Sequence, residues 1–247
     1  MTEGPHRPAP LRTLLLAGLT IVLTIGFVAL GFWQIERRAW KTDLIDRIEN
    51  RVAAEPVAPP EREDWPEITR EGAEYLRVSV EGLFLDREVL AQAVTERGSG
   101  YWVLSPLITE DGETIIVNRG FVPSGERMAT RVVPEGAQRI IGLLRLPEPG
   151  GGFLRANDPE AGRWYSRDVA AIAEDMGLGE VAPFFIDAEA GTNGGGSPVG
   201  GLTVIEFRNT HLVYALTWFT LAAMSMGATV MVVYAGLRPM RPTQQVS

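Results

Sequence analysis

The 247-residue sequence contains no cysteine and only two histidines. The absence of cysteine excludes disulfide bonds and metal sites built from thiolates. His6 lies in the N-terminal tail and His211 lies beside the last long apolar run. Because neither histidine lies in the segment between the two apolar runs, we expect no Ser-His-Asp triad and no two-histidine metal site there. Neighbouring acids such as Glu61 and Glu63, in a chain with 31 acidic residues, are more typical of a solvated surface than of a catalytic pair. The sequence does not predict an enzyme.

Positive charge is also scarce, since 23 basic residues face 31 acidic ones and the formal net charge is −8. A nucleic-acid surface needs clustered cations that displace counterions, so we expect no nucleic-acid partner. The chain has no Walker loop, dinucleotide fingerprint or G-x-S-x-G elbow. An apolar fraction of 45% nevertheless indicates a folded protein.

Two long runs carry no charged residue. One covers the 23 residues 13–35, and the other covers the 29 residues 209–237. A helix needs roughly 20 apolar residues to cross a bilayer, so both runs predict transmembrane helices in contact with lipid. The first run is longer than the apolar region of a signal peptide, which favours an uncleaved anchor. Two such spans are antiparallel.

Two spans place the tails 1–12 and 238–247 on one side of the membrane and residues 36–208 on the other. Basic residues flank the spans equally on both sides, so the positive-inside rule does not decide the orientation. Segment 36–208 contains 19 basic and 30 acidic residues, and a long acidic segment can be translocated whatever its flanks. We expect cytoplasmic termini and an extracytoplasmic central domain. The first twelve residues do not resemble a transit peptide, which favours a bacterial plasma (inner) membrane.

The central segment predicts a β-rich domain with one soluble helix, so the fold class is membrane α+β. Apolar residues at helical spacing extend the first span towards Ala53, and Pro56 ends that helix. Residues 168–176 predict the soluble helix, capped by Ser166 or Asp168. Residues 110–113 predict a hairpin turn and 191–201 a glycine-rich loop. Strands are expected at 75–81, 89–94, 101–109, 114–118, 138–146, 181–188 and 202–207.

The start of the second span carries the most specific pattern. Asn209 is suited to cap this helix through the amide of His211 or Leu212. One helical face is polar, small or aromatic, while Leu212, Leu216, Phe219 and Val230 lie on other faces and are expected to meet lipid. Its members are His211, Tyr214, Ala215, Trp218, Ala222, Ser225 and Thr229. The first span has a matching face, formed by Thr13, Thr20, Thr24, Gly31, Gln34 and Arg38. We expect the two helices to pack through these faces.

His211 lies in the first turn of its helix, where the helix dipole favours the neutral imidazole that binds metals. Alternatively, His211 forms only a hydrogen bond with a neighbouring helix. Antiparallel packing places Gln34, Arg37 and Arg38 at the same depth. Cations beside an iron ligand suit a haem with two propionates. The alternative is that the arginines anchor the helix end among lipid headgroups.

Four motifs resemble the surfeit-locus family of cytochrome c oxidase assembly factors. They are GFWQIERRAWK at residues 31–41, VNRGFVP at 117–123, WYSRDV at 164–169 and NTHLVYALTWF at 209–219. The resemblance extends in order from about residue 14 to residue 237. The family usually has Trp at the position of Phe121. Asn118 and Arg119 in the second motif are expected either to contact a partner or to complete a strand end and turn.

The resemblance implies a non-enzymatic helper that binds haem a and assists its insertion into subunit I of the oxidase. It implies that His211 is the iron ligand. The helix faces and depths described above then place Gln34, Arg37, Arg38, Tyr214 and Trp218 around the cofactor. Subunit I and the enzyme that makes haem a are the implied protein partners, and a second copy of the chain is a further candidate. A haem-independent membrane scaffold that stabilises assembly intermediates is the alternative.

Overall fold

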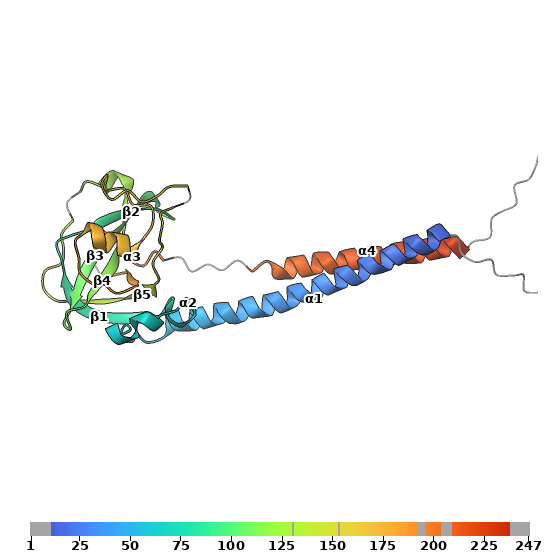
Figure 1. Ribbon diagram of the computed structural model, residues 1–247, viewed down its shortest axis with the longest axis horizontal. Helices are drawn as coiled ribbons and strands as arrows, with labels where there is room; N and C mark the ends of the chain where they lie inside the picture. The colour runs from blue at the N-terminus through green and yellow to red at the C-terminus, as the bar shows by residue number, and fades with distance from the viewer. Residues whose placement is uncertain (1–10, 130, 153, 192–195, 204–208, 238–247) are drawn as a thin grey trace, which may run out of the picture. The chain divides into compact units, whose positions relative to one another are not determined.

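The computed structural model describes residues 11–129, 131–152, 154–191, 196–203 and 209–237. The chain forms two compact units (Figure 1). The helical unit comprises Met1–Asp46 and Glu206–Ser247, and the β-domain comprises Arg47–Ile205. The expected strand at 202–207 falls largely outside the described residues, and Leu202 and Thr203 themselves are not in a strand.

Two long helices, α1 (Leu11–Ala53) and α4 (His211–Leu237), cover the two uncharged runs. As the sequence predicts, α1 continues beyond residue 35 without a break, for 43 residues in all. Ile48 is buried in this extension, and Leu44, Ile45 and Val52 are half-buried, so the predicted apolar pattern is also confirmed.

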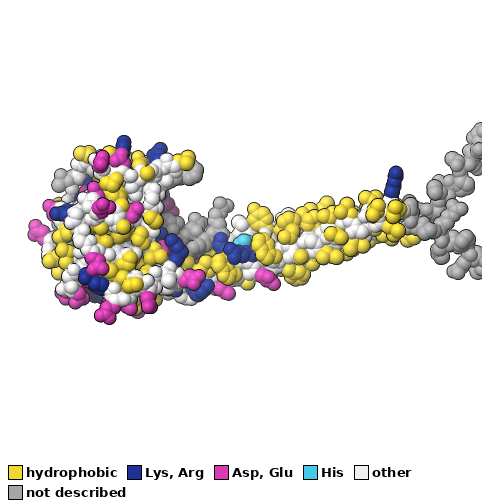
Figure 2. All heavy atoms as spheres, in the orientation of Figure 1, with side chains coloured by type: hydrophobic (Ala, Val, Ile, Leu, Met, Phe, Trp, Pro, Cys, Tyr) yellow, Lys and Arg dark blue, Asp and Glu magenta, His cyan; other side chains and the backbone are white. Residues whose placement is uncertain are grey.

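Both helices are long and apolar enough to cross a membrane. Only 17% of the most apolar stretch of α1 and 11% of that of α4 is buried. Leu15 is 64% exposed and Met231 is 74% exposed, whereas the core helix of a soluble protein would bury such side chains. Hydrophobic side chains cover the visible face of this unit (Figure 2). This surface indicates association with a membrane.

The two helices pack antiparallel through the predicted small and polar faces. Gly31 faces the ring of Phe219, which a Cβ atom at residue 31 would approach to 2.6 Å. Between the helices, Oγ1 of Thr229 donates a hydrogen bond to Oγ1 of Thr20 (2.7 Å), and Oγ of Ser225 donates to the Thr20 carbonyl (2.9 Å). Small residues allow this close approach, and the hydroxyl groups bond across it.

Tyr214, a member of the predicted contact face, is 55% exposed. The prediction for Phe219 is wrong. Phe219, expected to meet lipid, packs instead against Phe32, with ring centres 5.5 Å apart. The reason is Gly31, whose missing side chain leaves space that the phenyl ring fills.

The β-domain is built on a six-stranded mixed sheet in the order β1-β5-β6-β4-β3-β2. β1 also pairs with β3, so the sheet closes into a barrel of β1, β5, β6, β4 and β3. Only the β4–β6 pair is parallel among the described ladders. The strands are β1 (Arg77–Phe84), β2 (Val89–Thr95), β3 (Gly98–Thr109), β4 (Thr114–Pro123), β5 (Gln138–Arg145) and β6 (Phe185–Ala188).

Alternation along β4 and β6 divides the core into two clusters. Ile115, Val117 and Ile186 face one cluster, which also contains Trp65 and Phe184. Ile116 and Phe185 face the other cluster, which is covered by α3 (Val169–Asp175). As predicted, α3 is capped by Asp168, whose side chain accepts a hydrogen bond from the Ala171 amide.

Most predicted strands are confirmed, but β6 begins at Phe185 rather than at residue 181. Pro183 has no amide hydrogen to donate to a ladder, which accounts for the late start. The hairpin turn after Thr109 is confirmed, with Gly112 at φ 81°. A one-turn helix, α2 (Arg70–Ala73), and the 3₁₀ helices Arg62–Glu67 and Ser124–Glu126 were not predicted.

Asn118 and Arg119 neither complete a strand end nor lie at an exposed contact surface. Both are buried within β4, at a bulge where Val103 pairs with Gly120 and Leu104 with Asn118. Arg119 is the extra residue of the bulge. Gly120 adopts φ 135°, and a Cβ atom there would lie 2.3 Å from the carbonyl carbon of Val199.

We expect Gly120→Ala to lower the free energy of unfolding by roughly 2–4 kcal/mol, because alanine adds both backbone strain and a clash with backbone. Urea unfolding of the detergent-solubilised chain, followed by tryptophan fluorescence, measures this change. Gly125→Ala is the matched control, since a Cβ atom at residue 125 meets nothing within 4 Å. Equal stability of the two variants would contradict the role assigned to the bulge.

Candidate functional site

His211 and Gln34 meet between α4 and α1. Nδ1 of His211 lies 2.7 Å from Oε1 of Gln34, and Gln34 is 9% exposed. A carbonyl oxygen only accepts hydrogen bonds, so Nδ1 carries the hydrogen and Nε2 of the neutral ring carries the lone pair. This is the one hydrogen bond of the imidazole within the described part of the chain.

The cap predicted for Asn209 is wrong. The α4 amides of Val213 and Tyr214 bond instead to the carbonyl oxygen of Thr210. The Asn209 side chain reaches α1, where its Nδ2 lies 3.3 Å from Oγ1 of Thr42. The Thr42 hydroxyl donates to the Arg38 carbonyl, so it accepts the hydrogen bond from Asn209. Oδ1 of Asn209 remains a buried acceptor without a hydrogen-bond partner among the described residues.

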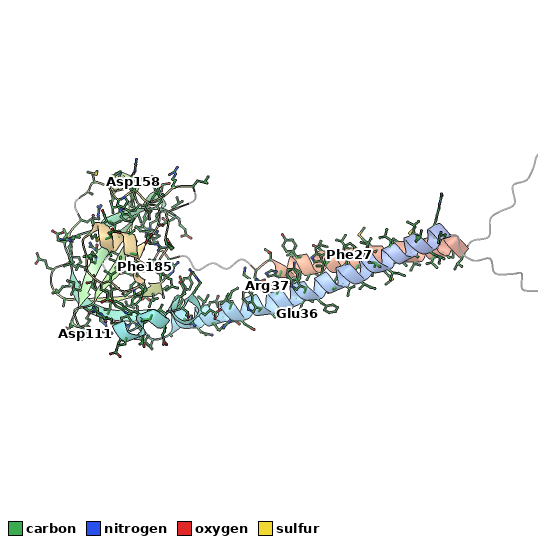
Figure 3. The ribbon with its side chains drawn as sticks, viewed as in Figure 1. Phe27, Glu36, Arg37, Asp111, Asp158 and Phe185 are labelled. Atoms are coloured by element: carbon green, nitrogen blue, oxygen red, sulfur yellow. The ribbon has the colours of Figure 1, made fainter. Side chains whose placement is uncertain are left out.

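Arg37 and Arg38 follow Gln34 within the next turn of α1, and both are exposed. The guanidinium carbon of Arg37 lies 4.0 Å from the centre of the Trp40 ring. Arg37 and Glu36 are labelled in Figure 3. The two cations therefore lie within one helical turn of the residue that bonds His211.

The two aromatic residues predicted for the site have different surroundings. Trp218 is half-buried and stacks on Phe27, with ring centres 5.8 Å apart. Tyr214 projects from the helix pair, as described above, although it lies one turn from His211. The structure thus brings Gln34 into contact with His211, whereas Tyr214 has no described contact with it.

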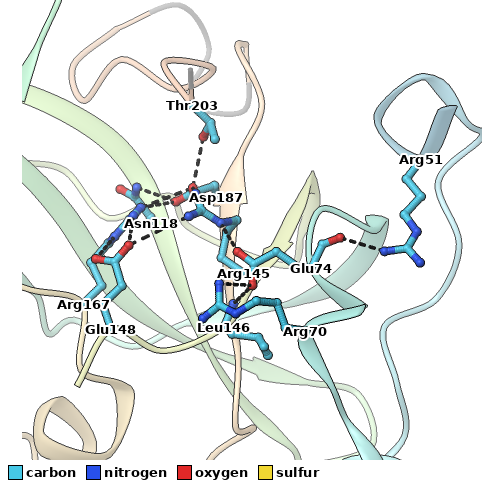
Figure 4. A network of polar contacts seen from close by, with 10 residues as sticks. All are labelled: Arg51, Arg70, Glu74, Asn118, Arg145, Leu146, Glu148, Arg167, Asp187 and Thr203. Atoms are coloured by element: carbon cyan, nitrogen blue, oxygen red, sulfur yellow. Dashed lines mark hydrogen bonds and ion pairs between the residues drawn. The ribbon is translucent and has the colours of Figure 1, made fainter. Parts of the chain in front are cut away.

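A second polar cluster lies in the β-domain, around the buried carboxylate of Asp187 (Figure 4). The carboxylate accepts hydrogen bonds from Asn118 (2.7 Å), Arg145 (3.0 Å) and Arg167 (3.1 Å). Arg145 also bonds Glu74, and Arg167 also bonds Glu148. This cluster was not predicted.

The cluster is balanced in charge, because Arg70, Arg145 and Arg167 oppose Glu74, Glu148 and Asp187. Burial lowers the pKa of Arg145, but the charge of Asp187 and the hydrogen bond to Glu74 outweigh burial and raise it. Burial likewise raises the pKa of Glu148, but the hydrogen bond and charge of Arg167 outweigh burial, so this pKa lies below its ordinary value. Fully paired charges favour a structural role.

The cluster also holds the two chain segments that enter and leave the β-domain. Arg51, in the last turn of α1, donates hydrogen bonds to the carbonyl oxygens of Glu74 and Glu71. Thr203, near the end of the domain, donates to the Asp187 carboxylate (3.0 Å). Asp187 and Glu74 thus connect both segments to the sheet.

The part of the chain that matches known proteins includes both polar clusters. The SURF1 family model matches residues 21–223. Human Surfeit locus protein 1 is 36% identical over 229 residues, which cover 82% of this chain and 72% of the relative. A SURF1-like protein of Monosiga brevicollis is 37% identical over 225 residues, covering 83% and 81%. A SURF1-like protein of Caenorhabditis briggsae is 30% identical over 234 residues, covering 83% and 72%. The chain belongs to the SURF1 family.

The family assignment confirms the resemblance predicted from the four motifs. SURF1 proteins are known as cytochrome c oxidase assembly factors. The family is thus one of assembly factors rather than of catalysts. The matched region includes Gln34 and His211. Phe121, where the SURF1 motif usually has Trp, is 1% exposed and packs edge-on against Trp102, so the position is an apolar core position.

We expect Glu148→Gln to make stability less dependent on pH in the acid range. A carboxyl group whose pKa is lower in the folded chain than in the unfolded chain adds stability at pH values above its unfolded pKa, which is near 4.5. This added stability is lost as the pH falls through the pKa of the folded chain. The unfolding temperature of the detergent-solubilised chain, measured between about pH 7 and pH 2, should therefore fall less steeply in the variant. Glu160→Gln, at an exposed position, is the control and should retain the steeper dependence.

Proposed function

We propose that this SURF1 protein binds haem a through His211 and assists its insertion into subunit I of cytochrome c oxidase. The hydrogen bond between His211 and Gln34 is the observation that carries this proposal. Iron-ligating histidines in proteins donate the hydrogen of their other ring nitrogen to an oxygen acceptor, which fixes the ring and its tautomer. Gln34 provides this acceptor, so Nε2 is the nitrogen that would hold iron.

The buried polar atoms around His211 also fit the cofactor. An unpaired buried acceptor costs roughly 1–3 kcal/mol, and Oδ1 of Asn209 is such an acceptor two residues before His211. Haem a, unlike haem b, carries a side-chain hydroxyl group that can donate a hydrogen bond. Asn209 would bind that donor, which favours haem a over a haem without the hydroxyl.

The exposed guanidinium groups of Arg37 and Arg38 would bind the two propionates through charge-assisted hydrogen bonds. Stacking on Trp40 orients Arg37 without neutralising its charge. Trp218 would add an apolar wall, and the exposed ring of Tyr214 would cover the cofactor edge. The cofactor supplies the redox-active iron of the oxidase, and the chain holds it and releases it.

A single protein ligand suits a carrier, since a carrier must also release what it binds. A second copy of the chain or the receiving protein would supply any further ligand. The partners would be subunit I and the enzyme that makes haem a. The helical unit would span a bacterial plasma membrane, with cytoplasmic termini and an extracytoplasmic β-domain.

The alternative is a haem-independent scaffold that stabilises assembly intermediates. The hydrogen bond between His211 and Gln34 also joins the two helices without any ligand, as a purely structural interhelical contact would. The haem carrier and the scaffold differ in the effect expected when the imidazole is removed, because only the carrier should lose haem.

We expect His211→Ala to purify with at least tenfold less haem than the unmodified chain, because the iron loses the imidazole nitrogen that we propose holds it. The visible absorption spectrum of the full chain, purified from cells that make haem a, measures the haem content. Thr220→Val, at an exposed position of α4, is the control and should stay coloured. Equal haem in His211→Ala, together with retained co-purification of subunit I, would support the scaffold instead.

We expect Gln34→Leu to weaken haem binding by about 10–100-fold, because the ring loses its orienting acceptor but keeps Nε2. Titration of the haem-free chain with haem, followed at the Soret band, measures this affinity. Gln34→Glu retains an acceptor and should bind more tightly than Gln34→Leu. Equal affinity of the two variants would show that Gln34 does not orient the ligand.

A further inference from the structure

A basic groove lies in the β-domain, apart from the Asp187 cluster. Its volume is about 150 Å³, and it lies between β2, β3 and the segment 155–165. Figure 3 labels Asp158, which pairs with Arg163 at this end of the domain. The groove residues used below are Tyr101, Arg127, Arg155, Arg163, Trp164 and Tyr165.

The charge of the groove is opposite to that of the segment that contains it. Residues 36–208 contain 30 acidic and 19 basic residues, yet three arginines meet in this groove. Arg163 pairs with Asp158, whereas neither Arg127 nor Arg155 forms an ion pair with a described acidic side chain. The groove therefore attracts anions on a surface that otherwise repels them.

Aromatic rings hold these two arginines in place. The guanidinium carbon of Arg127 lies 5.3 Å from the centre of the Tyr101 ring, and that of Arg155 lies 5.5 Å from the Tyr165 ring. Arg127 also donates a hydrogen bond to the Gly162 carbonyl. Such stacking orients a guanidinium group and retains its charge, so less entropy is lost when it binds a carboxylate.

Each of these arginines is followed or preceded in sequence by a highly exposed apolar side chain. Met128 is 90% exposed and Leu154 is 89% exposed. Leu154 adopts φ 58° in the turn closed by Gly152 and Arg155, a conformation that glycine or asparagine adopts far more readily. Leucine at this position is costly for folding, which indicates that its exposed side chain has another use.

We propose that this groove docks a segment of a partner protein in which one or two carboxylates are flanked by apolar side chains. Ligand pockets for small molecules usually measure about 300–1,000 Å³, so the groove accommodates side chains better than a cofactor. Arginine, tyrosine, tryptophan and methionine are the residues enriched at protein interfaces. Arg127 and Arg155 bind the carboxylates, and Met128 and Leu154 contact the flanking apolar residues.

Photo-cross-linking in membranes of the native host tests this docking directly. The full chain carries Leu154→p-benzoylphenylalanine, and mass spectrometry identifies the cross-linked partner segment. We expect an adduct whose segment contains Asp or Glu next to apolar residues, and we expect Arg127→Gln with Arg155→Gln to reduce its yield at least tenfold. Arg139→Gln, at an exposed arginine of β5 outside the groove, should leave the yield unchanged.

Two controls make every result decisive. The same cross-linker at Leu83, which is 54% exposed on β1, should not capture that segment. The arginine variants must retain the unfolding temperature of the unmodified chain, and a variant that does not is replaced by Arg127→Lys with Arg155→Lys. Absence of an adduct, an adduct with lipid, a segment without carboxylates, or a yield unaffected by loss of the arginines would each overturn the proposal.

Discussion

The helical unit depends on one physical constraint, which is that polar side chains between two closely packed helices with apolar outer surfaces must bond to each other. Little water reaches such a contact, and an unpaired polar group is costly there. Gln34 and His211 satisfy one another at one end of the helix pair, and Thr20 and Thr229 do so farther along it. These bonds fix the register of the helices, and that register sets what surrounds the imidazole.

In the β-domain, buried polar groups are also paired with each other, but by ion pairs rather than by hydrogen bonds between neutral side chains. Its closed sheet buries Asp187, and a buried carboxylate is tolerated because Arg145 and Arg167 bond it in return. Thr203 donates a hydrogen bond to the same carboxylate, so the position of the segment that leaves the β-domain and the stability of the ion cluster depend on each other. In the groove between β2 and β3, by contrast, aromatic rings rather than acids hold the positive charges of Arg127 and Arg155 in place.

Local pattern was sufficient to predict the helices and most strands, because period and turn residues act over a few positions. Helical spacing also predicted the contact faces, and antiparallel packing predicted that Gln34 lies near His211. The Asp187 cluster could not be predicted, since its central bonds join residues far apart in sequence, such as Arg145 with Glu74 (71 residues) and Arg145 with Asp187 (42 residues), which only the sheet order brings together. The packing position of the Phe219 ring was not predicted, because it depends on space that Gly31 leaves on the opposite helix.

The bond between Gln34 and His211 also bears on how a carrier would release its ligand. The imidazole is already oriented without a ligand, so binding requires no reorganisation of the ring. The affinity of the proposed haem site would then depend on one nitrogen and on contacts from exposed arginines, which water can replace readily. Such a site would bind quickly and hold loosely, and a receiving protein with two ligands would withdraw the cofactor from it.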